Sequence, residues 1–270
     1  MISPISRYNN DTKARWRGWV WNRVKDRLKK PAFKANVLYL AGDGNYDMRE
    51  AVKRGFKREN LIAVDIDETN VENARKQGCI GICCKVEDAL HCWPENFELD
   101  AVILDYCCGV NDNVMTVAMQ SSLYRCCGSG TTLVMNVQRG RDKARVYQPE
   151  GKTERQELLY AAIVTPLLRA MCGKTMLMRT MDELIEWRDY HEAHENTLID
   201  LQMKLDAIMR PDMYSYRAQR VYMDTLLITL PAIGTKLSGR HTTKDGKVMQ
   251  DVVRKLAAAK AIHTRRQKRR

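Results

Sequence analysis

The segment Val37-Leu-Tyr-Leu-Ala-Gly-Asp-Gly-Asn-Tyr-Asp47 decides the fold, because it joins a short apolar run to two glycines and then to a helix-forming stretch. A second apolar run, Leu61-Ile-Ala-Val-Asp-Ile-Asp67, follows one helix length later. This order predicts a first strand, a ligand-binding turn, a helix and a second parallel strand. We expect Asp47 to cap the helix, since Glu50 follows it at the spacing of a capping box.

The turn between these two strands indicates what kind of ligand it binds. Gly42 and Gly44 permit backbone angles closed to other residues and let a ligand approach the main chain. Asp65 follows Gly44 by roughly 20 residues, the spacing of an acid that binds an adenosine ribose. The loop lacks the third glycine of a dinucleotide site, and Asp43 and Asp47 would repel a pyrophosphate. We therefore expect a ligand that carries adenosine together with positive charge.

The rest of the middle of the chain alternates strands and helices. We expect further strands at 80–84, 101–104, 131–137, 214–217 and 221–230, and helices at 70–77, 113–126, 153–172 and 181–209. Short strands joined by helices indicate a parallel sheet covered on both faces, and such sheets bind ligands at the carboxyl ends of their strands. Asp88 and Asp105 lie at such ends, as do Gly42 and Asp65, which favours a real binding site.

Charge divides the 270-residue chain, of net charge +12, into three parts. Residues 1–34 contain 10 Lys and Arg against 2 acids, and residues 236–270 contain 12 against 2, whereas residues 35–235 contain 23 against 29. We expect a basic, Trp-rich helical extension, a main domain and a basic tail with these boundaries. Basic ends favour a polyanion, because each neutralised phosphate releases a counterion. Nucleic acid is therefore the expected partner, and solubilising tails are the alternative.

Both basic ends contain residues suited to nucleic acid. Trp16, Trp19 and Trp21 alternate with arginines; we expect the rings to cover the sheet, and stacking on bases is the alternative. A small-residue helix expected at 248–262 leads into a basic cluster at the end of the chain. The residues expected to bind phosphates there are Arg265, Arg266, Lys268, Arg269 and Arg270.

Composition excludes several other classes of protein. The sequence contains no run of about 18 apolar residues, so we expect no membrane span. The first ten residues lack the charged and then apolar order of a secretory signal. The nine cysteines include three adjacent pairs but no Cys-x-x-Cys motif, so we expect neither a disulfide framework nor a metal site. Buried thiols in a reducing compartment are the expected state, which indicates a cytoplasmic location without membrane contact.

The order of elements from 37 to 230 resembles the class I S-adenosylmethionine-dependent methyltransferases. This resemblance implies a Rossmann-like α/β fold whose seven-stranded, mostly parallel sheet has helices on both faces and an antiparallel last strand. It implies S-adenosylmethionine as cofactor, with Asp65 on the ribose, Ile66 beside the adenine and Asp88 at the adenine amino group. The implied cofactor-binding residues are Ala41, Gly42, Asp43, Gly44, Asp65, Ile66, Asp88 and Ala89. The chain also resembles phage- and plasmid-encoded methyltransferase-like proteins.

The segment Asp105-Tyr-Cys-Cys-Gly109 occupies the family motif that faces cofactor and substrate together. The resemblance implies catalytic roles for Asp105, which would orient a substrate amine or hold the cofactor's ammonium, for Tyr106, which would stack on a base, and for Cys108. Cys108 stands three residues after Asp105, as in RNA cytosine-C5 methyltransferases, but residues 136–139 lack their second cysteine. We therefore expect methylation of a DNA or RNA base at an amine or a ring nitrogen.

Two other functions stay open at the level of sequence. One is a methyltransferase for a protein or a small molecule, with the basic ends serving localisation. The other is a catalytically silent protein that keeps the methyltransferase fold and binds nucleic acid or plays a structural role. The departures of the glycine loop and of the segment after Asp105 from the common family pattern support this last alternative.

Overall fold

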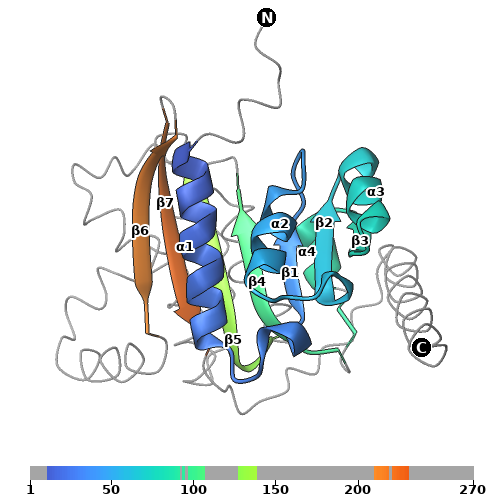
Figure 1. Cartoon of the computed structure of the whole chain (residues 1–270), viewed down its shortest axis with the longest axis horizontal. Coiled ribbons are helices and arrows are strands. Elements are labelled where there is room, and N and C mark those ends of the chain that lie inside the picture. The colour runs from blue at the N-terminus through green and yellow to red at the C-terminus, as the bar shows by residue number, and fades with distance from the viewer. Residues whose placement is uncertain are drawn as a thin grey trace, which may run out of the picture.

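The computed structural model describes residues 11–91, 93–94, 97–106, 127–138, 210–218 and 221–230. Their centre is a seven-stranded sheet with the order β3-β2-β1-β4-β5-β7-β6 (Figure 1). The strands are β1 (Val37–Leu40), β2 (Leu61–Asp65), β3 (Ile80–Cys83), β4 (Leu99–Asp105), β5 (Cys127–Gln138), β6 (Asp212–Ala218) and β7 (Val221–Thr229). Neighbours from β3 to β5 pair in parallel, whereas β7 is antiparallel to β5 and β6. This topology confirms the expected fold class and is typical of the class I methyltransferase fold.

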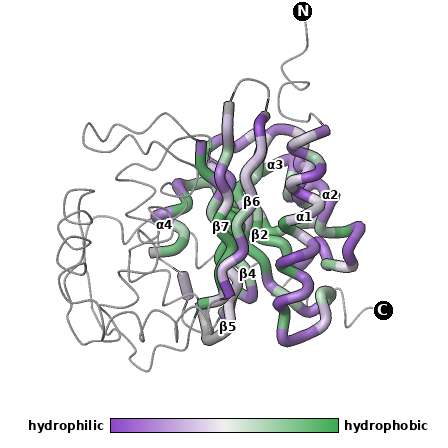
Figure 2. Tube along the Cα trace, turned by 90° about the vertical axis from the view of Figure 1, so that its left-hand side faces the viewer, coloured by the Kyte–Doolittle hydropathy of each residue, from purple (hydrophilic) through white to green (hydrophobic). Residues whose placement is uncertain are grey.

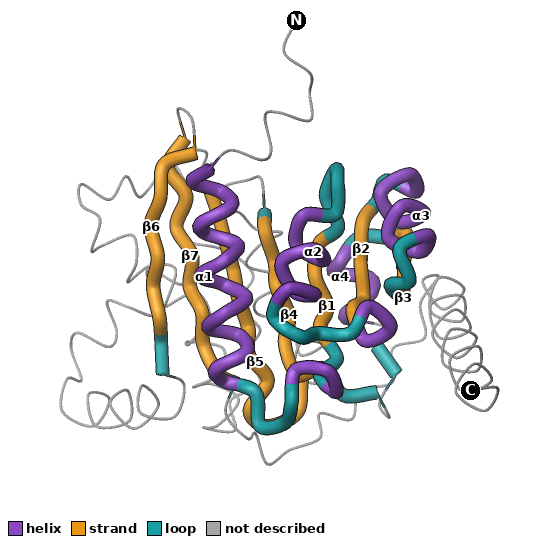
Figure 3. The backbone as a smooth tube through the Cα atoms, viewed as in Figure 1, coloured by secondary structure: helices purple, strands orange, loops and turns teal. Residues whose placement is uncertain are grey.

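Helices lie on both faces of the sheet, as expected. They are α1 (Asp11–Arg27), α2 (Tyr46–Lys53), α3 (Glu68–Lys76) and α4 (Val86–His91), with the short 3-10 helices η2 (Ala32–Lys34) and η3 (Arg58–Asn60). Figures 2 and 3 show α1, α2 and α3 on one face and α4 on the other. Strands β1 to β4 consist almost entirely of apolar residues, because side chains on both faces of this part of the sheet are buried.

The face under α1 contains the largest buried rings of the described residues. Trp16 and Trp21 are both 0% exposed and share one apolar cluster with Val37 and Tyr39 of β1. The Trp19 ring stacks on Tyr214 of β6 with 4.9 Å between the ring centroids. This confirms that Trp16 and Trp21 cover the sheet, and their burial excludes the alternative that they stack on bases.

The expected helix cap at Asp47 is wrong. The cap position of α2 is Asn45, whose backbone is left-handed with φ of 50°, and Asp47 lies in the first turn of the helix. The turn that precedes it contains Gly44 with φ of 81°, a conformation that favours glycine. The reason for the error is a tertiary contact: the Asp47 carboxylate accepts hydrogen bonds from α1 and is not free to cap its own helix.

Several expectations fall outside the described residues. These are the helices at 113–126, 153–172, 181–209 and 248–262, Cys108 and the basic cluster from Arg265 to Arg270. Within the described part, Cys79, Cys83 and Cys84 are not joined in disulfides. No helix of the described residues is long and apolar enough to cross a membrane.

Candidate functional site

The carboxyl ends of β1, β2 and β4 lie at one edge of the sheet, where the loop after β1 also lies (Figure 3). Parallel pairing produces this arrangement, since Leu40 pairs with Val64 and Tyr39 with Ile103. The first turn of α1 reaches the same edge (Figure 1). The edge therefore has two parts: an open part, formed by the loop after β1, the end of β2 and α4, and a closed part, formed by the end of β4 and the first turn of α2, both under α1.

The glycine loop of the open part leaves space beside its main chain. Ala41 is buried and donates its N–H to the Val64 carbonyl oxygen at 2.9 Å, whereas Gly42 and Asp43 are exposed. A Cβ at Gly42 would meet no atom within 4 Å, but a Cβ at Gly44 would lie 2.6 Å from the Tyr46 ring. Gly44 is thus required by the turn, whereas Gly42 leaves room for a group that approaches the backbone.

Asp65, at the end of β2, is held in place before any ligand is present. Its carboxylate accepts the N–H of Asp67 at 3.0 Å and the Nδ2–H of Asn70 at 2.9 Å, and it stays partly exposed. The next residue, Ile66, is 72% exposed, an unusual state for a large apolar side chain. An acceptor for hydroxyl groups therefore lies directly beside an uncovered apolar surface.

Asp88 and Ala89 lie in α4, the helix that follows β3. Asp88 is exposed and Ala89 is fully buried. The helix was not expected from sequence, and it places Asp88 on its outer side and Ala89 against the core. Asp88 is therefore accessible to a ligand, whereas Ala89 has a packing role.

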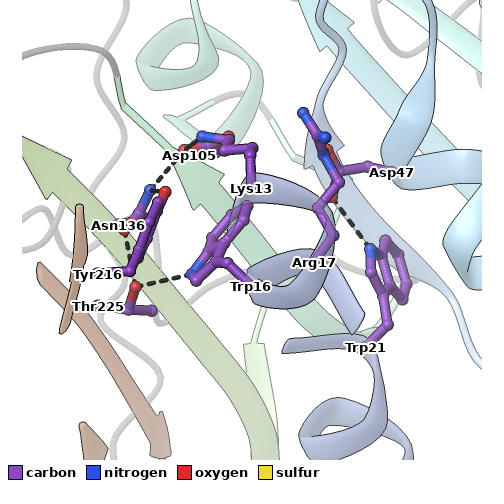
Figure 4. A network of polar contacts seen from close by, with 9 residues as sticks. All are labelled: Lys13, Trp16, Arg17, Trp21, Asp47, Asp105, Asn136, Tyr216 and Thr225. Carbon is purple, nitrogen blue, oxygen red and sulfur yellow. Dashed lines mark hydrogen bonds and ion pairs between the residues drawn. The ribbon is translucent and has the colours of Figure 1, made fainter. Parts of the chain in front are cut away.

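Asp105, in the closed part, is surrounded by donors (Figure 4). Lys13 of α1 approaches both carboxylate oxygens, at 2.8 Å and 2.6 Å, and Asn136 of β5 donates from Nδ2 at 2.7 Å. Only 12% of the Lys13 side chain and 15% of the Asp105 side chain are exposed. The Lys13 ammonium also lies over the Trp16 ring, 4.6 Å from its centroid. The Lys13 ammonium thus lies between the Asp105 carboxylate and the Trp16 ring and contacts both.

A relay of buried hydrogen bonds fixes the orientation of Asn136. Trp16 Nε1 can only donate, and it donates to Thr225 Oγ1 at 2.8 Å; the Thr225 hydroxyl then donates to Asn136 Oδ1 at 2.7 Å. Asn136 Nδ2 consequently faces Asp105 and the Tyr216 hydroxyl, 2.9 Å away. The opposite amide orientation would turn Oδ1 toward the carboxylate, so Asp105 must be the acceptor in this network.

Tyr216 lies at the far end of this relay and is 6% exposed. Burial raises the pKa of the Tyr216 hydroxyl, and the negative charges of Asp105 and Asp47 raise that pKa further, against the hydrogen bond from Asn136. Tyr216 is therefore a neutral phenol at physiological pH. Its hydroxyl accepts a hydrogen bond from Asn136 Nδ2 and adds no charge beside Asp105.

Asp47 forms a second buried ion pair with α1. Arg17 Nε and Trp21 Nε1 each donate to its carboxylate at 3.1 Å, and the residue is 8% exposed. Burial raises the pKa of Asp47, while the Arg17 guanidinium lowers it. The expectation that Asp47 presents negative charge to a ligand is therefore wrong, because that charge is neutralised inside the protein. Of the two acids of the loop, only Asp43 is exposed.

Sequence reasoning missed the residues that α1 contributes to the site. Lys13 and Arg17 were counted within a basic extension, but each pairs with an acid at the carboxyl edge. Asn136 lies within β5, and the sequence indicated no role for it beyond the absence of a cysteine in residues 136–139. Tyr106 is only partly exposed, and its backbone N–H donates to the Asn136 carbonyl oxygen at 2.9 Å, while Cys108 lies beyond the described residues.

Comparison with protein-family models and with curated proteins finds no match. Several solved structures are similar in shape. Human methyltransferase-like protein 13 in complex with SAH has a TM-score of 0.40 at 13% identity, over 91% of each chain. An O-methyltransferase from Bacillus cereus in complex with SAH has a TM-score of 0.42 at 9% identity, over 83% of this chain and 84% of that one. A probable spermidine synthase from Corynebacterium glutamicum has a TM-score of 0.42 at 11% identity, over 88% of this chain and 70% of that one.

Proposed function

We propose that this protein is an S-adenosylmethionine-dependent methyltransferase that acts on a nucleic-acid base. One observation carries the proposal: the pre-oriented Asp65 carboxylate lies directly beside the exposed Ile66, at the edge that also contains the open glycine loop. A ribose needs a hydroxyl acceptor, and an adenine needs an apolar surface. Both lie side by side here within a fold that binds ligands at this edge.

The residues of the open part fit this cofactor. Asp65 would bind the ribose hydroxyls, Ile66 would contact the adenine face, and the exposed Asp88 would accept from the adenine amino group. The space beside Gly42 would admit the methionine portion against the main chain. When bound, the cofactor supplies an electrophilic methyl group. The chain's own contribution is to position the acceptor and exclude water, for which a well-ordered edge is suited.

Asp105 would hold and orient a group that carries an ammonium or an N–H. Its carboxylate already accepts from the Lys13 ammonium and the Asn136 amide at 2.6 to 2.8 Å, which supports this role. Tyr106 and Cys108 stay proposed neighbours of the acceptor. Support for a nucleic-acid substrate comes from the charge of residues 236–270, which contain 12 Lys and Arg against 2 acids.

Titration calorimetry with S-adenosylhomocysteine tests the cofactor assignment. The full-length protein should bind the probe, and Asp65→Ala should abolish binding. Glu98→Ala is the matched control, because Glu98 is an exposed acid that precedes β4, at the edge of the sheet opposite the carboxyl ends of the strands. Binding that persists in Asp65→Ala would show that the site is assigned to the wrong residues.

Transfer of labelled methyl groups to DNA, RNA and bulk protein tests the substrate. We expect label in nucleic acid, and label in protein alone would favour the alternative substrate class. Deletion of residues 236–270 should flatten the salt dependence of nucleic-acid binding, since the slope reports the number of phosphates neutralised. An unchanged slope would exclude the tail as the electrostatic contact.

A second candidate function has one observation in its favour. Both oxygens of Asp105 are already occupied by Lys13 and Asn136, which suits a catalytically silent protein that uses the methyltransferase fold for binding. Such a protein would bind nucleic acid without transferring label. The labelled-methyl experiment therefore separates this candidate from the first.

A further inference from the structure

We propose that Asp105, Asn136 and the Trp16 ring form a binding site for an alkylammonium group, and that Lys13 is the internal occupant which a ligand displaces. The site has the composition that such a cation requires: one carboxylate, one aromatic face and a neutral amide that holds the carboxylate in place. The proposal goes beyond cofactor binding, since it concerns the closed part of the edge.

The walls of the site are rigid. Trp16 is 0% exposed and its indole N–H is fixed on Thr225, while Asn136 uses both ends of its amide, on Thr225 and on Asp105 with Tyr216. The Asp105 carboxylate therefore keeps its place whether or not Lys13 is present. A buried carboxylate without a cation is costly, so the site demands a positive charge.

The occupant, in contrast, can leave. Lys13 lies in the first turn of α1, and its ammonium reaches Asp105 through four methylene groups. The helix is anchored below that turn by the fully buried Trp16 and Trp21 and by the ion pair of Arg17 with Asp47. Lys13 can thus move to solvent without releasing α1. The exchange keeps the charge constant, because one ammonium replaces another.

The bound Lys13 also defines the ligand by chemistry. Its ammonium lies 2.6 and 2.8 Å from the two carboxylate oxygens and 4.6 Å from the ring centroid. A primary amine on a flexible alkyl chain satisfies this geometry. Two sources offer such a group: a protonated alkylamine other than a nucleobase, since base amines carry no charge, or the amino-acid end of the proposed cofactor. The second source rests on the proposed function, whereas the first does not.

The test compares the full-length protein with Lys13→Met, which keeps an unbranched apolar side chain and removes the charge. The probe is n-butylammonium chloride, and sodium chloride at equal concentration is the control for ionic strength. We expect n-butylammonium to raise the melting temperature of Lys13→Met above that in sodium chloride. We expect it to bind the variant about tenfold more tightly than the wild type, in which Lys13 competes.

Two further variants keep the test decisive. The double variant Lys13→Met/Asp105→Asn should show no specific response to n-butylammonium, because the carboxylate is gone. Lys13→Gln replaces Lys13→Met if the latter does not fold. An equal response of wild type and Lys13→Met, or a response that survives in the double variant, would overturn the proposal.

Titration with S-adenosylhomocysteine and with 5′-methylthioadenosine, which lacks the amino-acid end, separates the two sources. If Lys13→Met binds S-adenosylhomocysteine more tightly than the wild type does, but binds 5′-methylthioadenosine equally, the site belongs to the amino-acid end of the cofactor. If Lys13→Met binds n-butylammonium more tightly but S-adenosylhomocysteine equally, the site belongs to another alkylamine. The proposed function has its own test in Asp65→Ala. A protein that binds n-butylammonium at Asp105 but neither nucleoside would retain this inference and lose the proposed function.

Discussion

The open and closed parts of the carboxyl edge differ in how their acids are used, although both contain aspartates at the ends of strands. In the open part, Asp65 accepts only from nearby groups of its own loop and helix, and it stays partly exposed. In the closed part, Asp47 and Asp105 are neutralised by cations of α1 and lie almost completely inside. Identical side chains thus stay accessible in one part and attach a helix in the other.

The largest expected effect is on the closed part. Arg17→Met leaves the buried Asp47 without its counterion, and breaking a buried pair in this way costs about 3–5 kcal/mol of unfolding free energy. Urea unfolding measures the loss. The matched control is Arg23→Met on the same helix. The Arg23 side chain is 48% exposed and its Nε lies 3.6 Å from Asp212 Oδ2, so the loss of unfolding free energy should stay below about 1 kcal/mol. Equal losses in the two variants would contradict the distinction between buried and exposed pairs of α1.

The next effect is on the relay that orients Asn136. Thr225→Val keeps the shape of the side chain but leaves Trp16 Nε1 and Asn136 Oδ1 without their partner, at a cost of about 1–3 kcal/mol. Thr229→Val on the same strand is the control, since its hydroxyl accepts only a 3.3 Å bond from Arg27 at a partly buried site. We expect a change of about 0.5 kcal/mol or less there. Equal losses of unfolding free energy in Thr225→Val and Thr229→Val would show that the relay does not stabilise the fold.

A smaller effect concerns the pH dependence of the Arg17→Met variant. Burial already raises the pKa of Asp47 in the folded state, and removal of the guanidinium raises that pKa further. An acid with a raised folded-state pKa stabilises the fold below its ordinary pKa and loses this contribution as the pH rises through the folded-state value. The destabilisation by Arg17→Met should therefore be larger at pH 7 than at pH 5. Urea unfolding at both pH values checks the sign, and a smaller loss at pH 7 would be incompatible with a buried, unpaired Asp47.

The smallest effect on stability belongs to the open part. Gly42→Ala adds a Cβ that meets nothing within 4 Å, so thermal unfolding should change little, by about 0.5 kcal/mol in free energy. The same methyl group takes up the space offered to a ligand, and we expect weaker binding of S-adenosylhomocysteine in calorimetry. Gly44→Ala is the contrasting variant, because φ of 81° and the Tyr46 ring make it destabilising. Unchanged affinity in Gly42→Ala would place the ligand elsewhere.

The sequence was sufficient to predict the sheet because its signals are local. Apolar runs at 37–40 and 61–65 and the glycines between them are read within a few residues, and the structure confirms these strands. The state of Asp47 could not be read in this way. The cap residue of its helix is Asn45, in a left-handed conformation, and the partners of Asp47, Arg17 and Trp21, lie 30 and 26 residues away.

The sequence predicted the acids at the ends of the strands, Asp65 and Asp105, but not the residues that surround Asp105. Asp65 and Ile66 follow directly from the end of a strand, whereas Lys13 meets Asp105 across 92 residues and Trp16 meets Thr225 across 209. Pairing over such distances depends on how α1 lies on the sheet, which no local pattern encodes. The segment of residues 1–34 was therefore interpreted as a basic extension, although several of its cations have internal partners.

This internal pairing changes the meaning of the charge distribution. Lys13, Arg17 and Arg27 of α1 pair with Asp105, Asp47 and Asp212, and Lys30 pairs with Asp100. All of these acids belong to the middle part of the chain, which is acidic overall. Part of the positive charge of residues 1–34 thus balances that acidity. The tail of residues 236–270 becomes the better candidate for contact with a polyanion.

The contact between Trp16 and Thr225 also has a consequence for the order of events during synthesis. The two residues are 209 positions apart, so α1 leaves the ribosome long before its partner strand exists. Trp16 must remain without its partners Thr225 and Tyr216 until β6 and β7 have been made, and closing such a distant contact is slow. A nascent chain stopped before β7 should therefore expose an aromatic surface, which makes the N-terminal helix the segment most dependent on completion of the chain.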